Sequence, residues 1–98
     1  MPSDRREIPG QVKMKPITIY TTKLCPYCFA AKRLLKDKGA QFAEIDVSFD
    51  RGARNTMTER AGGRHTVPQI FVGDLHLGGC DELYALDNDG RLDNLITA

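Results

Sequence analysis

Two cysteines three positions apart, Cys25 and Cys28, have the clearest chemical potential in this sequence. Such a pair can hold half of a metal site, form a structural disulfide, or work as a redox couple. A tetrahedral zinc site needs four ligands, and only Cys80, His65 and His76 remain, scattered along the chain. A structural disulfide suits an oxidising compartment rather than a reducing one. The pattern therefore favours redox chemistry and predicts no metal.

The composition indicates a reducing compartment. Three cysteines are an odd number, whereas a secreted disulfide scaffold usually has more of them and an even count. The opening MPSDRREIPGQVK lacks the apolar stretch of a signal peptide, and no window approaches the ~20 apolar residues of a membrane span. A formal net charge of +1 gives no reason to expect nucleic acid or a membrane as partner. We expect a soluble, cytoplasmic monomer.

The order of the predicted elements is typical of an α/β protein. Residues 1–15 contain several breakers and are interpreted as a flexible N-terminal arm or an added extension, which leaves residues 16–98 as one domain. Apolar and alternating patterns predict strands at 17–21, 41–47, 69–72 and 75–77. Helical spacing, with Pro26 and several glycines as boundaries, predicts helices at 26–38, 51–61, 80–90 and 91–98.

These elements predict a four-stranded mixed sheet flanked by helices. The first two strands should be parallel, because a helix joins them in a right-handed crossover, and the last two should form a hairpin. Cys25 then lies in the turn after the first strand, at the edge of the sheet where α/β proteins bind ligands.

The position of Cys25 before a helix favours a reactive thiol. Unpaired backbone N–H groups and the helix dipole stabilise a thiolate there, and Lys23 adds a nearby cation. Cys28 lies one turn inside the helix, close enough to attack a disulfide formed on Cys25. The pair therefore predicts a nucleophile and a resolving thiol, with Pro26 stiffening the loop between them.

Two later segments each allow two interpretations. A cis peptide bond at Pro68 would leave the backbone of Val67 free to pair with an extended peptide, but Pro68 can equally start an edge strand. Gly78-Gly79 and a helix beginning at Cys80 and Asp81 can accept a carboxylate and an ammonium group. The same residues can equally form an acidic helix start beside a buried cysteine.

As a set, these residues resemble a glutaredoxin over about residues 16–97. The resemblance rests on TTKLCPYC (21–28), TVPQIFV (66–72) and GGCDELYAL (78–86), and the chain is most similar to the small bacterial dithiol type. It implies a thioredoxin-like fold and glutathione as co-substrate, without a permanently bound cofactor. The implied activity is the reduction of protein disulfides and of glutathione mixed disulfides.

The resemblance also assigns residues. It makes Cys25 the nucleophile and Cys28 the resolving cysteine. It implies that glutathione is held by Lys23 and Tyr27 before and within the helix, and by Thr66, Val67, Pro68, Cys80 and Asp81 in the later segments. Arg60 and Arg64 stay open as the second carboxylate anchor, because the loop AGGRH before Thr66 is one residue longer than in many relatives.

The implied mechanism begins with attack by Cys25 on a glutathione mixed disulfide. The protein thiol leaves, and a second glutathione regenerates Cys25. For protein disulfides, Cys28 resolves the intermediate instead. One alternative is a carrier in which two chains share a [2Fe–2S] cluster, although members that hold clusters usually have a smaller or more flexible residue than Pro26. Another is an inactive binding module that uses only the groove.

Overall fold

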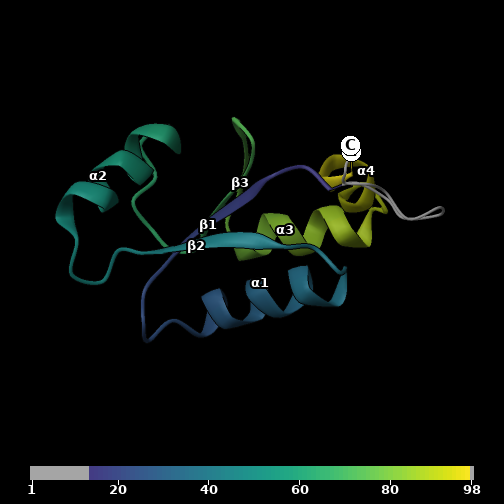
Figure 1. The fold of residues 1–98 in the computed structure, drawn as a ribbon, viewed down its shortest axis with the longest axis horizontal. Coiled ribbons are helices and arrows are strands. Elements are labelled where there is room, and N and C mark those ends of the chain that lie inside the picture. Colours follow the sequence, from purple (N-terminus) through teal and green to yellow (C-terminus); the bar gives the residue numbers. More distant parts are fainter. Residues whose placement is uncertain (1–13, 98) are drawn as a thin grey trace, which may run out of the picture.

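The computed structural model describes residues 14–97. The elements follow one another as β1 (Ile17–Thr21), α1 (Pro26–Asp37), β2 (Phe42–Asp46), α2 (Arg51–Arg60), β3 (Gln69–Val72), β4 (Leu75–Gly78), α3 (Cys80–Asn88) and α4 (Leu92–Ile96) (Figure 1). Their order confirms the prediction, and the observed ends differ from the predicted ones by at most two residues.

The sheet has the predicted mixed topology. Its four strands lie in the order β2-β1-β3-β4. β1 and β2 run parallel, with Ile17 opposite Phe42 and Thr21 opposite Asp46. β3 is antiparallel to both β1 and β4. The parallel pair follows from the α1 crossover, because only an antiparallel pair can be joined by a short turn.

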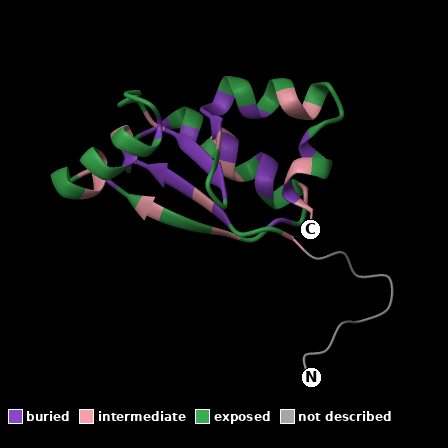
Figure 2. Cartoon of the chain, turned by 90° about the horizontal axis from the view of Figure 1, so that it is seen from above, coloured by how far each residue is buried: buried purple, intermediate pink, exposed green. Residues whose placement is uncertain are grey.

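Alternating side chains of the central strands build a core on each face of the sheet. Ile17 and Ile19 of β1 face one way and pack with residues of α1, α3 and α4. Tyr20 of β1 faces the other way and packs with Phe71 of β3 and Met57 of α2. In Figure 1, α1 and α3 lie together below the strands and α2 lies apart from them. Figure 2 shows the central strands largely buried, as expected for a sheet covered on both faces.

The two ends of α1 form where the sequence predicts them. Cys25 has an extended backbone and caps the helix, and Pro26 occupies a first-turn position where its missing N–H is not needed. Lys38 caps the other end, and Gly39 follows with a φ of 72°, a left-handed conformation that glycine adopts without steric cost. These local signals place Cys25 directly after the β1–α1 turn.

The predicted N-terminal arm, residues 1–15, lies outside the described residues except for Met14 and Lys15. Met14 forms a β-bridge with Thr97, and the N–H of Lys15 donates to the carbonyl oxygen of Ile96 at 2.7 Å. Within residues 14–97, no helix combines the length and the apolar character that crossing a bilayer requires.

Candidate active site

The Cys25 sulfur lies at the start of α1, between two backbone groups. Its Sγ accepts the backbone N–H of Cys28 at 3.1 Å, which makes the sulfur itself the cap of α1. On the other side, Sγ lies 3.9 Å from the carbonyl oxygen of Val67, to which the neutral thiol donates. The backbone N–H group and the positive end of the helix dipole both stabilise negative charge on this sulfur. The role of Cys25 as the nucleophile stays a prediction, and these contacts define the surroundings in which it would act.

Cys28 is more deeply buried than Cys25. Its side chain is 1% exposed, whereas that of Cys25 is 7% exposed. Burial, together with a hydrogen bond with Cys25, raises the pKa of Cys28 to about 12, partly offset by a backbone hydrogen bond with Thr22. Cys28 is therefore a thiol at neutral pH, which suits a residue that acts only after Cys25 has reacted.

This difference predicts selective alkylation of the reduced protein. Between pH 7 and pH 9, iodoacetamide should label Cys25 and leave Cys28 unlabelled, because Cys28 remains buried and protonated. After unfolding in guanidinium chloride, both thiols should react. Peptide mass spectrometry separates the two sites. Equal labelling rates for the two cysteines in the folded protein at pH 8 would contradict the burial argument.

An open groove lies beside this thiol pair. Its volume is about 140 Å³, and its walls come from α1, the loop before β3, and the start of α3. The lining residues are Tyr27, Arg64, Thr66, Val67, Pro68, Gly79, Cys80, Asp81 and Glu82. The Val67–Pro68 peptide bond is cis, as the resemblance implies. Six of the residues implied for glutathione thus lie around one groove, and Arg64, Gly79 and Glu82 join them.

Gln69 holds the Thr66–Val67 side of the groove from within the core. Its side chain is fully buried, and its Nε2 donates to the carbonyl oxygen of Thr66 at 3.0 Å and to Oγ1 at 3.3 Å. His76 completes the network, because its Nε2 lies 2.6 Å from Gln69 Oε1. Burial and the positive charge of Arg64 lower the pKa of His76. The sequence analysis gave Gln69 no separate role, because it stands at the start of the otherwise apolar strand QIFV.

The structure separates the two arginines that the sequence left as alternatives. Arg64 lines the groove, and its Nη1 donates to Glu82 Oε1 at 3.2 Å. Arg60 instead donates to the hydroxyl of Tyr20 at 2.9 Å, and its guanidinium lies 4.2 Å from the centroid of the Phe71 ring. Arg64 is therefore the arginine placed to meet a ligand in the groove.

Glu82 ties this arginine to the start of α3. Its Oε1 accepts the N–H of Gly79 at 2.6 Å, and this hydrogen bond, together with Arg64, lowers the pKa of Glu82. Beside it, Cys80 is 9% exposed, and its pKa is raised by burial and by the charge of Asp81. The first N–H groups of α3 and the carboxylate of Asp81 therefore lie together at one end of the groove.

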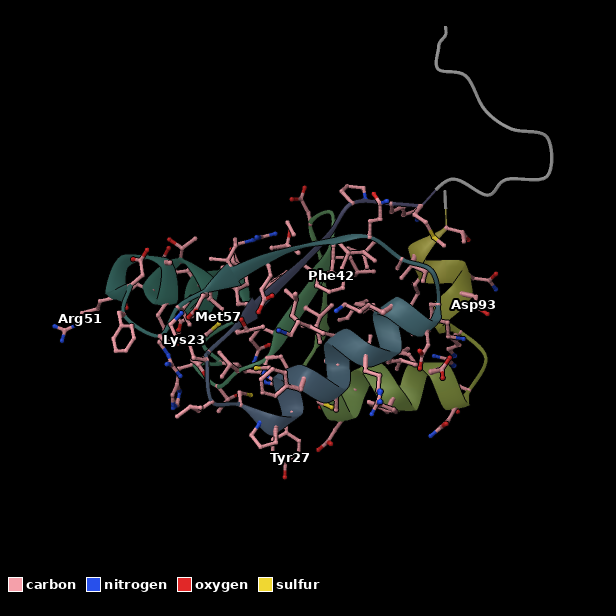
Figure 3. The ribbon with its side chains drawn as sticks, turned by 60° about the horizontal axis from the view of Figure 1, so that its bottom comes forward. Lys23, Tyr27, Phe42, Arg51, Met57 and Asp93 are labelled. Atoms are coloured by element: carbon pink, nitrogen blue, oxygen red, sulfur yellow. The ribbon has the colours of Figure 1, made fainter. Side chains whose placement is uncertain are left out.

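Lys23 lies outside the residues that line the groove. Its Nζ pairs with Asp46 at 3.0 Å, and its N–H donates to Ser48 Oγ at 2.9 Å. Hydrogen bonds from Ser48, and then the one from Lys23, lower the pKa of Asp46 to about 2. Figure 3 labels the side chains of Lys23 and Tyr27, which precede and follow Cys25 in the sequence. Lys23 is therefore already paired with one carboxylate.

A buried dithiol at the start of a helix, on a mixed sheet of this topology, defines the class of protein as a thioredoxin-like thiol oxidoreductase. The family model for glutaredoxin matches residues 17–77, and the chain belongs to that family. Within residues 14–97, no group of three or more His, Cys, Asp or Glu side chains is arranged to hold a metal ion.

Known proteins support this assignment in sequence and in structure. The chain is 49% identical to glutaredoxin 3 of Escherichia coli K12 over 83 residues, which cover 85% of this chain and 99% of the relative. The solution structure of a glutaredoxin from Brucella melitensis matches with a TM-score of 0.76 at 53% identity, covering 89% of this chain and 94% of that one. A buckwheat glutaredoxin–glutathione complex matches with a TM-score of 0.76 at 27% identity, covering 84% and 76%.

Proposed function

We propose that this protein is a glutathione-dependent thiol–disulfide oxidoreductase of the cytoplasm, which reduces protein disulfides and glutathione mixed disulfides. The observation that carries the proposal is the groove beside Cys25, whose lining brings together the Val67–Pro68 segment, a cation at Arg64 and a carboxylate at Asp81. Glutathione offers the complementary groups: an extended backbone, two carboxylates and one ammonium. The structural relative from buckwheat, a complex with glutathione, adds support.

The groove suggests how glutathione is oriented. The backbone of Val67 would pair with that of the cysteinyl residue, because β-like pairing holds extended peptides on exposed backbone. The γ-glutamyl carboxylate would meet the N–H groups at the start of α3, and Asp81 would accept a hydrogen bond from the ammonium. Arg64 would bind the glycine carboxylate, with Lys23 as a second cation and Tyr27 along one side. This orientation places the glutathione sulfur at Cys25.

The chemistry consists of successive thiol–disulfide exchanges. The Cys25 thiolate attacks the glutathione sulfur of a mixed disulfide, a new S–S bond forms, and the protein thiolate leaves and takes up a proton. A second glutathione thiolate then attacks the glutathione sulfur bound to Cys25. This step releases glutathione disulfide and regenerates the Cys25 thiolate.

A protein disulfide requires one further step. After Cys25 has formed a mixed disulfide with the substrate, Cys28 attacks the Cys25 sulfur and expels the second substrate thiolate. Because the pKa of Cys28 is raised, its proton must be removed as it attacks, and the departing thiolate is the nearest acceptor. Glutathione then reduces the Cys25–Cys28 bond in two exchanges.

The direct test is reduction of a glutathionylated peptide by glutathione, coupled to NADPH through glutathione reductase. We expect turnover that depends on both the protein and glutathione. Absence of turnover from a folded, fully reduced sample would contradict the proposal. The [2Fe–2S] carrier is not favoured by any observation in residues 14–97, and Pro26 occupies the first turn between the two thiols. Anaerobic reconstitution with iron, sulfide and glutathione tests it.

Substitutions of the two cations should separate their contributions to glutathione binding. Arg64→Ala should raise the KM for a glutathionylated peptide roughly fivefold to tenfold, because the charged hydrogen bond from Arg64 to the glycine carboxylate of glutathione is lost. Lys23→Ala should raise it less than about threefold, because Lys23 lies outside the groove lining and is exposed. Steady-state kinetics gives KM and kcat separately, with Arg91→Ala as the matched control. A larger effect for Lys23→Ala would reverse this assignment.

A further inference from the structure

A second hollow lies on the outer surface of α1, and the proposed glutathione site does not use it. Phe29, Lys32, Arg33, Lys36 and Asp37 line it, and its volume is about 400 Å³. The hollow is larger than the groove and shares no lining residue with it. It therefore needs a separate explanation.

The hollow combines an exposed aromatic ring with a concentration of positive charge. The Phe29 side chain is 57% exposed, and the Nζ of Lys32 lies 5.0 Å from the centroid of its ring. Lys32 also pairs with Glu44 at 2.9 Å, but no carboxylate of residues 14–97 forms an ion pair with Arg33 or Lys36. Asp37 is the only acidic residue of the lining. The chain carries a formal net charge of +1, so this positive charge is local.

The hollow and the groove lie on different sides of α1. Tyr84 of α3 donates to the carbonyl oxygen of Ala30, so the groove side of α1 faces α3. Lys32 reaches Glu44 of β2, so the hollow lies toward the opposite edge of the sheet. If glutathione occupies the groove, the substrate protein of a mixed disulfide has to extend away from Cys25 on the other side of α1. The outer surface of α1 is available there.

The residues of the hollow continue along α1 from the nucleophile. Positions 25, 29, 33 and 36 recur at helical spacing and share one face. At 1.5 Å per residue, Arg33 lies about 12 Å and Lys36 about 16 Å along the helix from Cys25. An extended peptide advances about 3.3 Å per residue, so its positions roughly four and five residues from the attacked cysteine reach these cations.

We infer that the outer surface of α1 docks the segment of a substrate protein next to its disulfide cysteine, and selects segments with acidic side chains about four and five residues from that cysteine. An apolar residue about two positions away lies over Phe29. This inference rests on the proposed function and adds to it a class of protein substrate. Charge complementarity carries it, because carboxylates at these positions meet Arg33 and Lys36, for which residues 14–97 supply no acidic partner.

The test compares glutathionylated peptides that differ only in charge. One peptide carries Glu four and five residues from its cysteine, on the N-terminal side in one version and on the C-terminal side in another. Its partner carries Gln at the same positions. Wild-type kcat/KM should favour a Glu peptide over its Gln partner by roughly threefold to tenfold, since each exposed ion pair contributes modestly. Raising the ionic strength to about 0.5 M should reduce this ratio toward one.

Variants localise the effect to α1. The double substitution Arg33→Glu and Lys36→Glu should bring the ratio to one or below. Lys15→Glu with Arg91→Glu introduces the same charge change on exposed residues away from the hollow, and it should keep the ratio. The milder pair Arg33→Gln and Lys36→Gln serves if the reversal unfolds the protein, which circular dichroism detects.

The outcomes separate this inference from the proposed function. Turnover of the Gln peptides by the wild type tests glutathione dependence alone. Equal kcat/KM for Glu and Gln peptides in the wild type, or an equal loss of the ratio in the Lys15/Arg91 variant, would overturn the inference while the proposed function stands. Loss of the ratio in the α1 variants alone, together with its salt dependence, would support it.

Discussion

Cys25→Ser is expected to reduce turnover of every disulfide substrate by roughly a thousandfold or more. Serine has the shape of cysteine, but its hydroxyl is not ionised at neutral pH and cannot form the mixed disulfide on which both reactions depend. The coupled glutathione reductase assay measures the loss directly. Residual activity above about one hundredth of wild type would mean that another thiol performs the first attack.

This variant carries its own structural control. Cys25 caps α1 through its side chain, which accepts the N–H of Cys28. Serine is among the preferred residues at this position, so the cap is retained and α1 should not be weakened. We therefore expect a melting temperature at or above that of the wild type. A large fall in melting temperature would mean that the activity loss reports unfolding instead of lost chemistry.

Cys28→Ser should separate the two reactions. Reduction of a glutathionylated peptide should stay within about threefold of wild type, because that route uses only Cys25 and a second glutathione. Reduction of a protein disulfide should fall by roughly a hundredfold, because the mixed disulfide with substrate loses its intramolecular resolving thiol. Free glutathione must then resolve it in a slower intermolecular step. Parallel assays with a glutathionylated peptide and a disulfide-bonded protein check this.

Burial explains why the two cysteines divide the work. Cys28 is 1% exposed and its pKa is raised to about 12, so it cannot replace Cys25 in the first attack. A serine hydroxyl there stays in a buried site and costs about 1 kcal/mol or more if it lacks a partner. Thermal unfolding measures that cost. Loss of both reactions in a folded Cys28→Ser protein would contradict a route that needs only Cys25.

The sequence predicts the elements that place Cys25 because their signals are local. The β-branched and aromatic run before Cys25, proline in the first turn of α1 and Gly39 after it each depend on a few neighbouring residues. The mixed topology follows from connection lengths, since a helix separates β1 from β2 and a short turn separates β3 from β4. These features carry the dithiol to the correct edge of the sheet.

The surroundings of the dithiol depend on contacts that no local pattern encodes. Lys23 meets Asp46 because β1 and β2 pair with Thr21 opposite Asp46, a register set by the whole sheet. The choice between the arginines depends on the path of the chain through Gly62 and Gly63, which have φ values of 66° and 102°. That turn carries Arg64 to the groove and leaves Arg60 on α2.

A buried polar residue is hard to recognise for the same reason. Gln69 lies between a proline and three apolar residues, and its neighbours in the sequence do not indicate that Thr66 and His76 are its hydrogen-bond partners. Two signals mark Gln69 once its partners are known. A proline precedes the strand, and the first residue of the strand has a hydrogen-bonding side chain. A polar side chain in an otherwise apolar strand invites a search for partners on the adjacent strand and loop.

The bridge between Met14 and Thr97 brings both ends of the described chain to one place. That place lies beyond the start of β1, whereas Cys25 follows its end; the seven steps of extended chain from Met14 to Thr21 span about 23 Å. A domain fused after residue 97 therefore leaves the thiol open to other substrates. A redox sensor that must present its own disulfide to Cys25 needs a Gly/Ser linker of roughly 17 residues, the length whose root-mean-square span matches that distance.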